Sequence, residues 1–433
     1  MILSVEKSQL SGRVRIPASK SHTVRAVAIA SLASGTSRIS NPLVSADALS
    51  AVEVYRRLGA SISTEEEWTI EGIGGIPTVP DDILDVGNSG TTLYIAMGTA
   101  GLIDGYTILT GDHQIRSRPA GPLLEALTGL GVEGFSTRGN GKPPLVIKGP
   151  IRGGQTVLDG GKTSQYLSSL LLNCPLAEGD TEILVENATE IPYIDITLAW
   201  LDDQGIRCER EGYNKFYVPG GQKYYAFAKS IPGDFSSATF FLCAAAITGS
   251  ELILQGLEMS DPQGDKAVVD MLRCMGAEIE QMPEGIRIKG GELKGGEFDM
   301  SATPDALPAM AVTACFAKGT TRLVNVPQAR LKETDRIAVM HRELSAMGAD
   351  IHELPDGLVI EGKPLHAARV QGHGDHRVVM ALAVAGLACS GQTEIDTAEA
   401  MEITFPNFVE LMKGSGAHMQ LVAQQTSLDF GSM

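Results

Sequence analysis

The chain has 433 residues, of which 43% are hydrophobic and 20% charged, and its formal net charge is −17. This length exceeds what one hydrophobic core organises, so two domains of about 200 residues each are expected. The negative charge argues against nucleic acid or an anionic membrane as a partner, and no apolar run reaches the roughly 20 residues of a membrane span.

The first residues, MILSVEKSQLSGRVRIP, lack the basic-then-apolar layout of a secretory signal. The six cysteines form no CxxC pair and lie mostly in apolar stretches, which indicates buried free thiols in a reducing compartment. We therefore expect a cytoplasmic protein, and we expect it to be a monomer.

Six segments read as an amphipathic helix that ends in glycine and leads into a short strand. They span residues 47–62, 120–134, 195–209, 266–280, 338–352 and 407–420. Glycine after the last apolar turn is the expected helix stop, because it adopts the left-handed conformation cheaply. The closing glycines recur at roughly 70-residue intervals, at Gly59, Gly131, Gly205, Gly276, Gly348 and Gly416.

A second series of helices alternates with the first. These helices are small and apolar all round, within residues 24–35, 91–101, 164–179, 237–249, 304–319 and 378–391. Without a polar face they should be buried, and strand-like runs such as TEILVEN, SELILQG and TRLVNVP follow them. The sequence thus predicts six similar units, three in each domain.

The starts of the buried helices carry polar residues. Capping alone is the favoured interpretation for Asp234, Ser236, Ser237 and Asn88. Capping does not explain Lys20, Arg25 and Arg377, because a helix start disfavours positive charge. Several helix starts facing one cleft, with added cations, predict a site for anions.

Two further segments are rich in charge. Residues 110–127 carry Arg116 and Arg118 before a proline-led helix, and residues 329–340 carry Lys332, Glu333 and Arg336 at a helix start. Either segment alone would indicate a solvated helix face with ion pairs. Together with the helix starts they predict a cluster suited to carboxylate or phosphate.

Ten motifs in order carry a family resemblance: SKSHTVR, NSGTT, TGDHQIRSRP, TSQY, PYIDIT, GDFSSA, TPDA, LKETDRI, GDHR and ITFPNF. From end to end the chain resembles the EPSP synthase family of enolpyruvyl transferases. The resemblance implies a two-domain inside-out α/β barrel with six βαβαββ repeats, three per domain. It implies one domain of residues 1–18 plus 233–433 and an inserted domain of residues 19–232.

The resemblance also implies an activity: transfer of the enolpyruvyl group of phosphoenolpyruvate to the 5-hydroxyl of shikimate 3-phosphate, with release of phosphate, in aromatic amino-acid biosynthesis. It implies Asp305 as the base, Glu333 as a proton relay, and Lys20 as a third catalytic group. The residues implied for the acceptor are Ser21, Arg25, Thr163, Ser164, Gln165, Tyr193, Asp305, Gln328 and Lys332. Those implied for phosphoenolpyruvate are Lys20, Gly90, Thr91, Arg118, Gln165, Arg336 and Arg377, and His376 lies in a matching motif.

The implied reaction protonates a methylene carbon, adds a hydroxyl to C2 and expels phosphate. It needs acid and base groups and fixed positive charge, and no metal or organic cofactor is expected. The sister family that loads UDP-N-acetylglucosamine uses Lys-Asn at the first helix and a loop cysteine. Here Lys20-Ser21 and a cysteine-free GDHQIRSRP argue against that family.

Three positions depart from the family pattern. Tyr94 replaces an Arg, Ile403 replaces a Lys for which Lys413 is a possible substitute, and Glu190 replaces a phosphate-binding Ser. A carboxylate beside the acceptor's phosphate would be repelled by about 4 kcal/mol per pair of unit charges at about 4 Å and an effective dielectric near 20. Glu190 avoids this if it points away and Thr189 takes its place.

Two alternatives therefore stay open. One is a paralogous transferase whose carboxylated acceptor lacks the 3-phosphate, such as a hydroxybenzoate. The other is a ligand-binding relative without turnover, against which Asp305 and Glu333 argue, because binding alone needs no proton-transfer pair.

Overall fold

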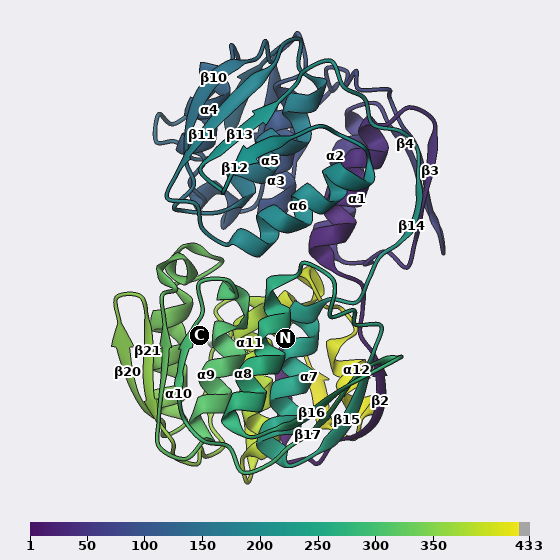
Figure 1. The fold of residues 1–433 in the computed structure, drawn as a ribbon. Coiled ribbons are helices and arrows are strands. Elements are labelled where there is room, and N and C mark those ends of the chain that lie inside the picture. Colours follow the sequence, from purple (N-terminus) through teal and green to yellow (C-terminus); the bar gives the residue numbers. More distant parts are fainter. Residues whose placement is uncertain (424–433) are drawn as a thin grey trace, which may run out of the picture.

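A computed structural model describes residues 1–423, which form two lobes joined at a waist (Figure 1). One lobe contains helices α1 to α6, and the other contains the N-terminus and helices α7 to α12. Among residues 1–423, no helix has both the length and the apolar character needed to cross a membrane.

The sheets of the first lobe contain residues 36–230. They are β14-β3-β5-β4 (Ala228–Ser230, Thr36–Ser40, Trp68–Glu71 and Ser61–Thr64), β6-β7-β9-β8 (Leu84–Asp85, Thr107–Thr110, Leu145–Lys148 and Glu133–Ser136) and β10-β11-β13-β12 (Gly154–Asp159, Thr181–Glu186, Lys215–Val218 and Glu209–Glu211).

The sheets of the second lobe combine the N-terminal strands with later ones. They are β16-β17-β15-β2 (Glu278–Met282, Gly285–Lys289, Glu251–Gln255 and Ser11–Arg15), β18-β19-β21-β20 (Glu297–Asp299, Thr320–Val324, Gly357–Glu361 and Asp350–Leu354) and β22-β23-β1-β24 (Arg369–Val370, Gln392–Ile395, Ile2–Glu6 and His418–Val422).

All six of these sheets share one topology. In each sheet an edge strand and its neighbour run parallel, and the remaining two pairings are antiparallel. The predicted strand-like runs TEILVEN and SELILQG contain β11 and β15, and TRLVNVP covers all of β19 except its first residue, Thr320. This repetition in the sheets confirms the sixfold organisation and the two-domain α/β class.

The apolar helices form the centre of each lobe, as their composition predicts. They are α1 (Lys20–Leu32), α3 (Gly90–Ala100) and α5 (Gln165–Asn173) in the first lobe, and α7 (Phe235–Thr248), α9 (Leu307–Cys315) and α11 (His376–Ala388) in the second. Nearly every residue of these helices is buried.

The capping prediction is confirmed for Asp234 at the start of α7 and is wrong for Asn88 at the start of α3. Asp234 accepts a hydrogen bond from the Ser237 amide at 3.1 Å and caps α7. The capping interpretation is wrong for Asn88, because its side chain donates to Asp112 and Gln114 while Ser89 caps α3. It is also wrong for Ser236, whose hydroxyl donates to Asp265 from inside the helix.

The amphipathic helices cover the sheets and end as predicted. They are α2 (Ala46–Arg57), α4 (Gly121–Gly129), α6 (Ile191–Asp203), α8 (Ala267–Met275), α10 (Arg336–Ala346) and α12 (Phe408–Gly414). Each is followed by its predicted glycine in the left-handed region, with φ between 66° at Gly205 and 113° at Gly59 and Gly276. The repeated glycine is therefore a helix stop.

Two separate hydrophobic cores account for the lobes. One contains buried residues between Ala18 and Ile231, and the other contains residues from Leu3 to Ile16 and from Phe235 to Met419. The chain crosses between them twice, side by side: the Ser19 amide donates to the Pro232 carbonyl at 2.8 Å. The chain passes from one core to the other near residues 17 and 232, close to the predicted domain bounds. The bounds themselves stay a prediction.

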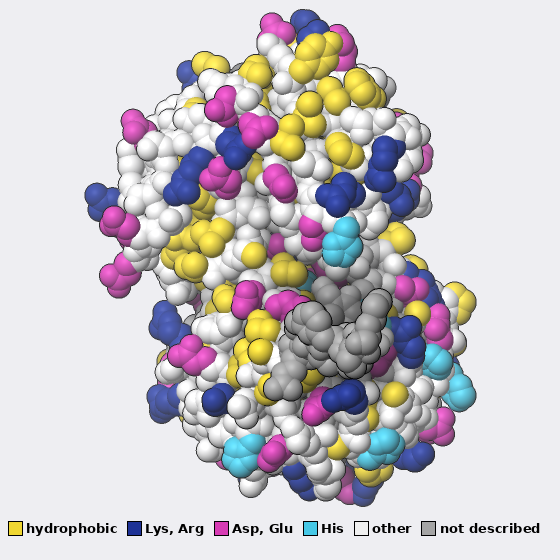
Figure 2. Space-filling model, turned by 180° about the vertical axis from the view of Figure 1, so that it is seen from behind, with side chains coloured by type: hydrophobic (Ala, Val, Ile, Leu, Met, Phe, Trp, Pro, Cys, Tyr) yellow, Lys and Arg dark blue, Asp and Glu magenta, His cyan; other side chains and the backbone are white. Residues whose placement is uncertain are grey.

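The face opposite to that of Figure 1 shows how the charge is distributed (Figure 2). Lysine and arginine side chains are interspersed with aspartate and glutamate over both lobes on this face. The negative net charge is thus not gathered into one patch on this face.

Candidate active site

Two adjoining pockets lie between the two cores. The first is lined by residues at the starts of all six buried helices, among them Ser21, Thr91, Ser164, Ser236, Asp305 and Arg377. The second lies beside it and adds Arg118, Glu333 and Arg336. Both pockets include Lys20, Thr91, Gln165, Asp305, Lys332 and Arg377. The prediction that these helix starts meet at one cleft is confirmed.

Arg336 is the centre of the second pocket's charge network. It is the first residue of α10 and is 1% exposed. Its Nε and Nη2 donate to Asp375 at 2.9 and 3.2 Å, Nη1 donates to Asp305 at 2.8 Å, and Nη2 also donates to Glu333 at 2.5 Å. One guanidinium thus fixes three carboxylates, and this multidentate geometry is one that only arginine provides.

Asp305 lies between two arginines at the junction of the pockets. Arg377 Nη2 is 2.8 Å from its Oδ2, and the Tyr193 hydroxyl is 3.5 Å from the same oxygen. Burial alone would raise the pKa of Asp305, but the charges of Arg377 and Arg336 outweigh it and hold the pKa well below its usual range. This carboxylate is therefore ionised in the ligand-free protein.

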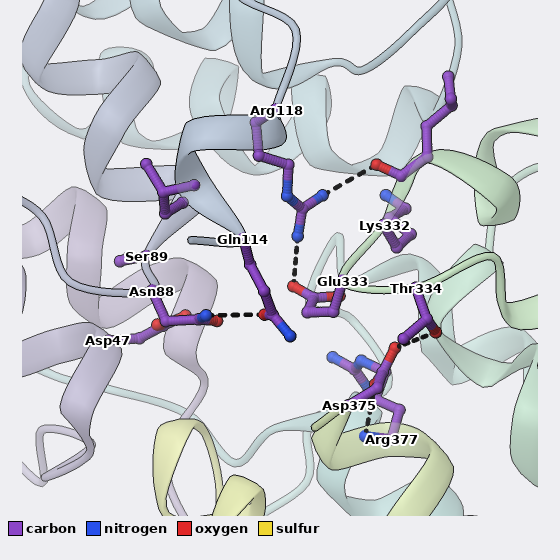
Figure 3. Close-up of polar contacts among 12 residues, drawn as sticks. Asp47, Asn88, Ser89, Gln114, Arg118, Lys332, Glu333, Thr334, Asp375 and Arg377 are labelled. Carbon is purple, nitrogen blue, oxygen red and sulfur yellow. Dashed lines mark hydrogen bonds and ion pairs between the residues drawn. The ribbon is translucent and has the colours of Figure 1, made fainter. Parts of the chain in front are cut away.

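Glu333 joins the lobes. Arg118, from the first lobe, donates through Nη2 to Glu333 Oε1 at 2.6 Å and through Nη1 to the Leu331 carbonyl at 3.0 Å (Figure 3). Burial opposes ionisation of Glu333, but Arg118 and Arg336 dominate and lower its pKa well below the usual value. Gln114 adds a second link, since its Nε2 donates to the Gly374 carbonyl at 3.3 Å.

Lys20 begins α1 and faces a carboxylate that the sequence analysis did not single out. Its Nζ is 3.1 Å from Asp47 Oδ2, and Asp47 is 4% exposed at the start of α2. Burial raises the pKa of Asp47, and the charge of Lys20 opposes that rise. Lys20 is thereby held at the boundary of both pockets.

Arg25 differs from the other arginines of the pockets. It is 1% exposed, and its guanidinium donates to Thr197, to Ser168 and to the carbonyls of Ser21 and Tyr193 at 2.9–3.1 Å. Among residues 1–423, no carboxylate lies within salt-bridge distance of it. Burial lowers the pKa of Arg25 to about 10, so it stays charged at neutral pH. A buried unpaired cation at a pocket wall favours an anionic ligand there.

Glu190 points into the cleft. It is 3% exposed, and its Oε2 accepts hydrogen bonds from Thr163 Oγ1, Ser164 N and Ser164 Oγ at 3.0–3.1 Å. Its Oε1 accepts from Lys332 Nζ, which comes from the other lobe. The possibility that Glu190 turns away and Thr189 replaces it is thus not what the structure shows.

The other two departures from the family pattern have different surroundings. Tyr94 is 3% exposed, lines the second pocket, and donates to the Pro119 carbonyl at 2.9 Å. Ile403 is half-buried and lines neither pocket, whereas its neighbour Thr404 lines the first. The structure therefore offers no cation at either position.

His376, at the start of α11, is buried in the wall of the second pocket. Burial lowers its pKa to about 3, so the ring is neutral at pH 7. Both ring nitrogens are without a hydrogen-bond partner among residues 1–423. A neutral ring with free nitrogens is suited to a polar contact with a ligand.

Most of the residues named from the sequence lie together, with two exceptions. Gln328 lines neither pocket, and its Nε2 donates to the Ser301 carbonyl at 3.1 Å. Arg116 also lines neither pocket, and its Nη1 donates to the Gly111 carbonyl. The sequence analysis missed Asp47, Asp265 and Asp375 as members of the site. Asp375 stands in the quoted GDHR motif, whereas Asp47 and Asp265 lie on helix starts with no local signal beyond an acidic first turn.

The fold and these pockets define a two-domain α/β protein whose cleft presents arginines, lysines and two ionised carboxylates to an anionic ligand. Comparisons with known proteins identify the family. The family model described as EPSP synthase (3-phosphoshikimate 1-carboxyvinyltransferase) matches residues 5–412. The chain belongs to the EPSP synthase family.

Relatives and solved structures agree over the full length. The chain is 58% identical to the 3-phosphoshikimate 1-carboxyvinyltransferase of Ruminiclostridium cellulolyticum, over 98% of this chain and 100% of that protein. It is 57% identical to the protein of the same name from Acetivibrio thermocellus, over 96% and 99% of the two chains. The solved EPSP synthase of Acinetobacter baumannii superposes with a TM-score of 0.82 at 31% identity, covering 97% of this chain and 100% of that one.

Proposed function

We propose that the protein transfers the enolpyruvyl group of phosphoenolpyruvate to the 5-hydroxyl of shikimate 3-phosphate and releases phosphate. The relatives that match over their whole length carry the name of this activity. The observation that carries the proposal is that Arg336 holds Asp305 and Glu333 on two nitrogens of one guanidinium. The base and the proton relay that the reaction needs are thereby fixed in one cleft.

The acceptor is assigned to the first pocket. Arg25 and Ser21 would bind its ring carboxylate, because Arg25 is a buried cation without a carboxylate partner among residues 1–423. Thr163, Ser164 and Lys332 would bind its phosphate. Tyr193 and Gln165 would border the ring, and Gln328 would need a side-chain rotation to reach a hydroxyl.

Phosphoenolpyruvate is assigned to the second pocket. The amides of Gly90 and Thr91 lie in the first turn of α3, where a helix presents unpaired N–H groups. The remaining groups assigned to it are Lys20, Arg118, Gln165, Arg336 and Arg377. Fixed cations there would stabilise the negative charge that develops as phosphate leaves.

Substrate binding would change the proton affinity of both carboxylates. In the ligand-free protein the arginines hold the pKa values of Asp305 and Glu333 low. Anionic substrates would take over part of that positive charge, which would raise the pKa of each carboxylate toward its usual value. Asp305 would then accept the 5-hydroxyl proton as the oxygen attacks C2, and Glu333 would relay a proton from solvent to the methylene carbon. The tetrahedral adduct would then lose phosphate from C2 and a proton from the new methyl group, which restores the double bond.

A second acceptor class has one observation in its favour. Glu190 already lies on the groups assigned to the acceptor's phosphate, so a carboxylated ring alcohol or phenol without phosphate would fit the cleft with Glu190 in place. This candidate keeps Arg25 and Asp305 in the same roles.

Phosphate release from phosphoenolpyruvate, measured with shikimate 3-phosphate, shikimate and 3-hydroxybenzoate as separate acceptors, tests both candidates. Release with shikimate 3-phosphate supports the first. Release with an unphosphorylated acceptor and none with shikimate 3-phosphate supports the second. We also propose a cytoplasmic monomer, because one chain supplies both walls of the cleft and Cys174, Cys243, Cys315 and Cys389 are buried free thiols; light scattering measures the mass.

A further inference from the structure

Glu190 occupies the place of a ligand. It precedes α6 and offers both carboxylate oxygens to donors from three residues on two segments: the Thr163 hydroxyl, the Ser164 amide and hydroxyl, and the Lys332 ammonium. These are the groups that the proposed function assigns to the acceptor's phosphate. The sequence left its orientation open, and its burial at 3% exposure places the charge inside the cleft.

The donors form a set suited to one anion. Two hydroxyls, one amide and one ammonium donate hydrogen bonds, and the ammonium also carries positive charge. A carboxylate accepts these hydrogen bonds much as the oxygens of a phosphate would. A second anion cannot share the same donors without repulsion between the two charges. Binding of the Glu190 carboxylate and binding of the acceptor's phosphate to these donors are therefore mutually exclusive.

The contact also joins the two lobes. Lys332 lies between the 3-10 helix at Pro327–Leu331 and α10, on the second lobe, and Glu190 lies on the first. The pair holds this edge of the cleft together without any acceptor. A phosphate that displaces Glu190 would itself link Lys332 of the second lobe to Thr163 and Ser164 of the first.

We propose that Glu190 is an internal competitor of the acceptor's phosphate and sets the affinity for phosphorylated acceptors. This inference rests on the proposed function. Glu190 must leave Thr163, Ser164 and Lys332 before the phosphate can bind there. Glu190 does not compete with an acceptor that lacks phosphate. Glu190 therefore reduces the difference in affinity between shikimate 3-phosphate and shikimate.

The test compares wild type with Glu190→Ser and with the near-isosteric Glu190→Gln in steady-state phosphate release. In both variants the KM for shikimate 3-phosphate should fall at least about tenfold, equivalent to about 1.4 kcal/mol. The kcat should stay within about twofold because the reacting groups are untouched, and the KM for shikimate should not fall, because shikimate has no phosphate to compete with Glu190. Glu186→Ser, an exposed glutamate on β11, is the matched control and should match wild type.

Each result decides the matter. An unchanged or higher KM for shikimate 3-phosphate in the Gln and Ser variants would overturn the inference, as would an equal fall in the Glu186→Ser control. The Gln variant keeps the test valid if Glu190→Ser does not fold.

A binding measurement separates the inference from the proposed activity. If wild type releases no phosphate with shikimate 3-phosphate, the proposed activity fails. The rise in melting temperature with shikimate 3-phosphate then still reports on Glu190. A larger rise in Glu190→Gln than in wild type supports competition, and equal rises contradict it.

Discussion

At the scale of single residues, the cleft is defined by how its charges are paired. Arg118, Arg336, Arg377 and Lys20 each contact a carboxylate, whereas Arg25 contacts hydroxyls and carbonyls. A buried ion pair is costly to break because the remaining charge stays desolvated. The paired cations are therefore fixed in position before substrates bind. Arg25 is the cation whose charge is not balanced by a carboxylate among residues 1–423.

Asp305 is the residue whose loss should affect the chemistry most directly. We expect Asp305→Asn to lower kcat roughly 10²- to 10⁴-fold, the usual range for removing a general base. The fold should persist, because Arg336 keeps its contacts with Asp375 and Glu333. Steady-state phosphate release measures the effect, with exposed Asp350→Asn as the control. A kcat near that of wild type would remove Asp305 from the base role.

Asp265 should make stability depend on pH. Burial, reinforced by the charge of Asp305, raises its pKa from 3.8 to about 6. The folded protein thus binds this proton more tightly than the unfolded chain, so its contribution is fully present below pH 3.8 and is lost as the pH rises through about 6. The free energy of unfolding of wild type, relative to Asp265→Asn, should fall between pH 4.5 and 7.5 in urea titrations. A pH-independent difference would contradict this.

At the scale of helices and strands, the same unit is built six times within residues 1–423. A polar residue lies at the start of each buried helix or within two residues before it, an apolar run places that helix in the core, and a glycine follows each covering helix. The starts of all six buried helices line the first pocket, so the buried helices of each lobe direct their N-terminal ends toward the same cleft. Local sequence thus decides what each element is, and packing decides where it points.

A helix-ending glycine gives the prediction at this scale. Gly276 has φ of 113°, and an added Cβ would lie 2.8 Å from the Glu292 carbonyl oxygen. We expect Gly276→Ala to lower the free energy of unfolding by about 1–2 kcal/mol or more, through backbone strain and this contact. Gly414→Ala is the control, since it lies in α12 with open space around its Cα and should be neutral or slightly stabilising. Urea denaturation of the two variants measures both; equal effects would contradict the argument.

At the scale of the whole molecule, the lobes meet through a few polar contacts. Arg118–Glu333 and Lys332–Glu190 lie in the cleft, and His22–Asp261 lies outside both pockets. Trp200 Nε1 donates to His22 Nδ1 at 3.0 Å, so the ring proton is on Nε2 and is donated to Asp261 at 3.2 Å. This contact favours the closed arrangement without touching substrates.

Removing it should open the molecule. We expect Asp261→Ala to increase the radius of gyration in small-angle X-ray scattering and to raise the KM of both substrates several-fold. The kcat should stay within about twofold, because saturating substrates draw the lobes together. Asp270→Ala removes an exposed acid that pairs with Arg273 on the same helix and is the control. An unchanged radius and unchanged KM values would show that this contact does not govern closure.

The sequence by itself determined the six repeats, the helix stops, the buried helices and the family, because each depends on residues close together in the chain or on motifs in fixed order. It also named most of the cleft residues. It did not reveal Asp47 and Asp265 as members of the site, because a local acidic residue does not disclose its distant partner.

Only the tertiary structure decided which charges face one another. Lys332 and Glu190 are 142 positions apart and belong to different lobes, and Arg336 meets Asp375 from 39 positions away. Whether Glu190 enters the cleft depends on where the second lobe places Lys332, and no local pattern encodes that. The electrostatic state of the site follows from distances across the interface, which the fold sets and the order of residues alone does not.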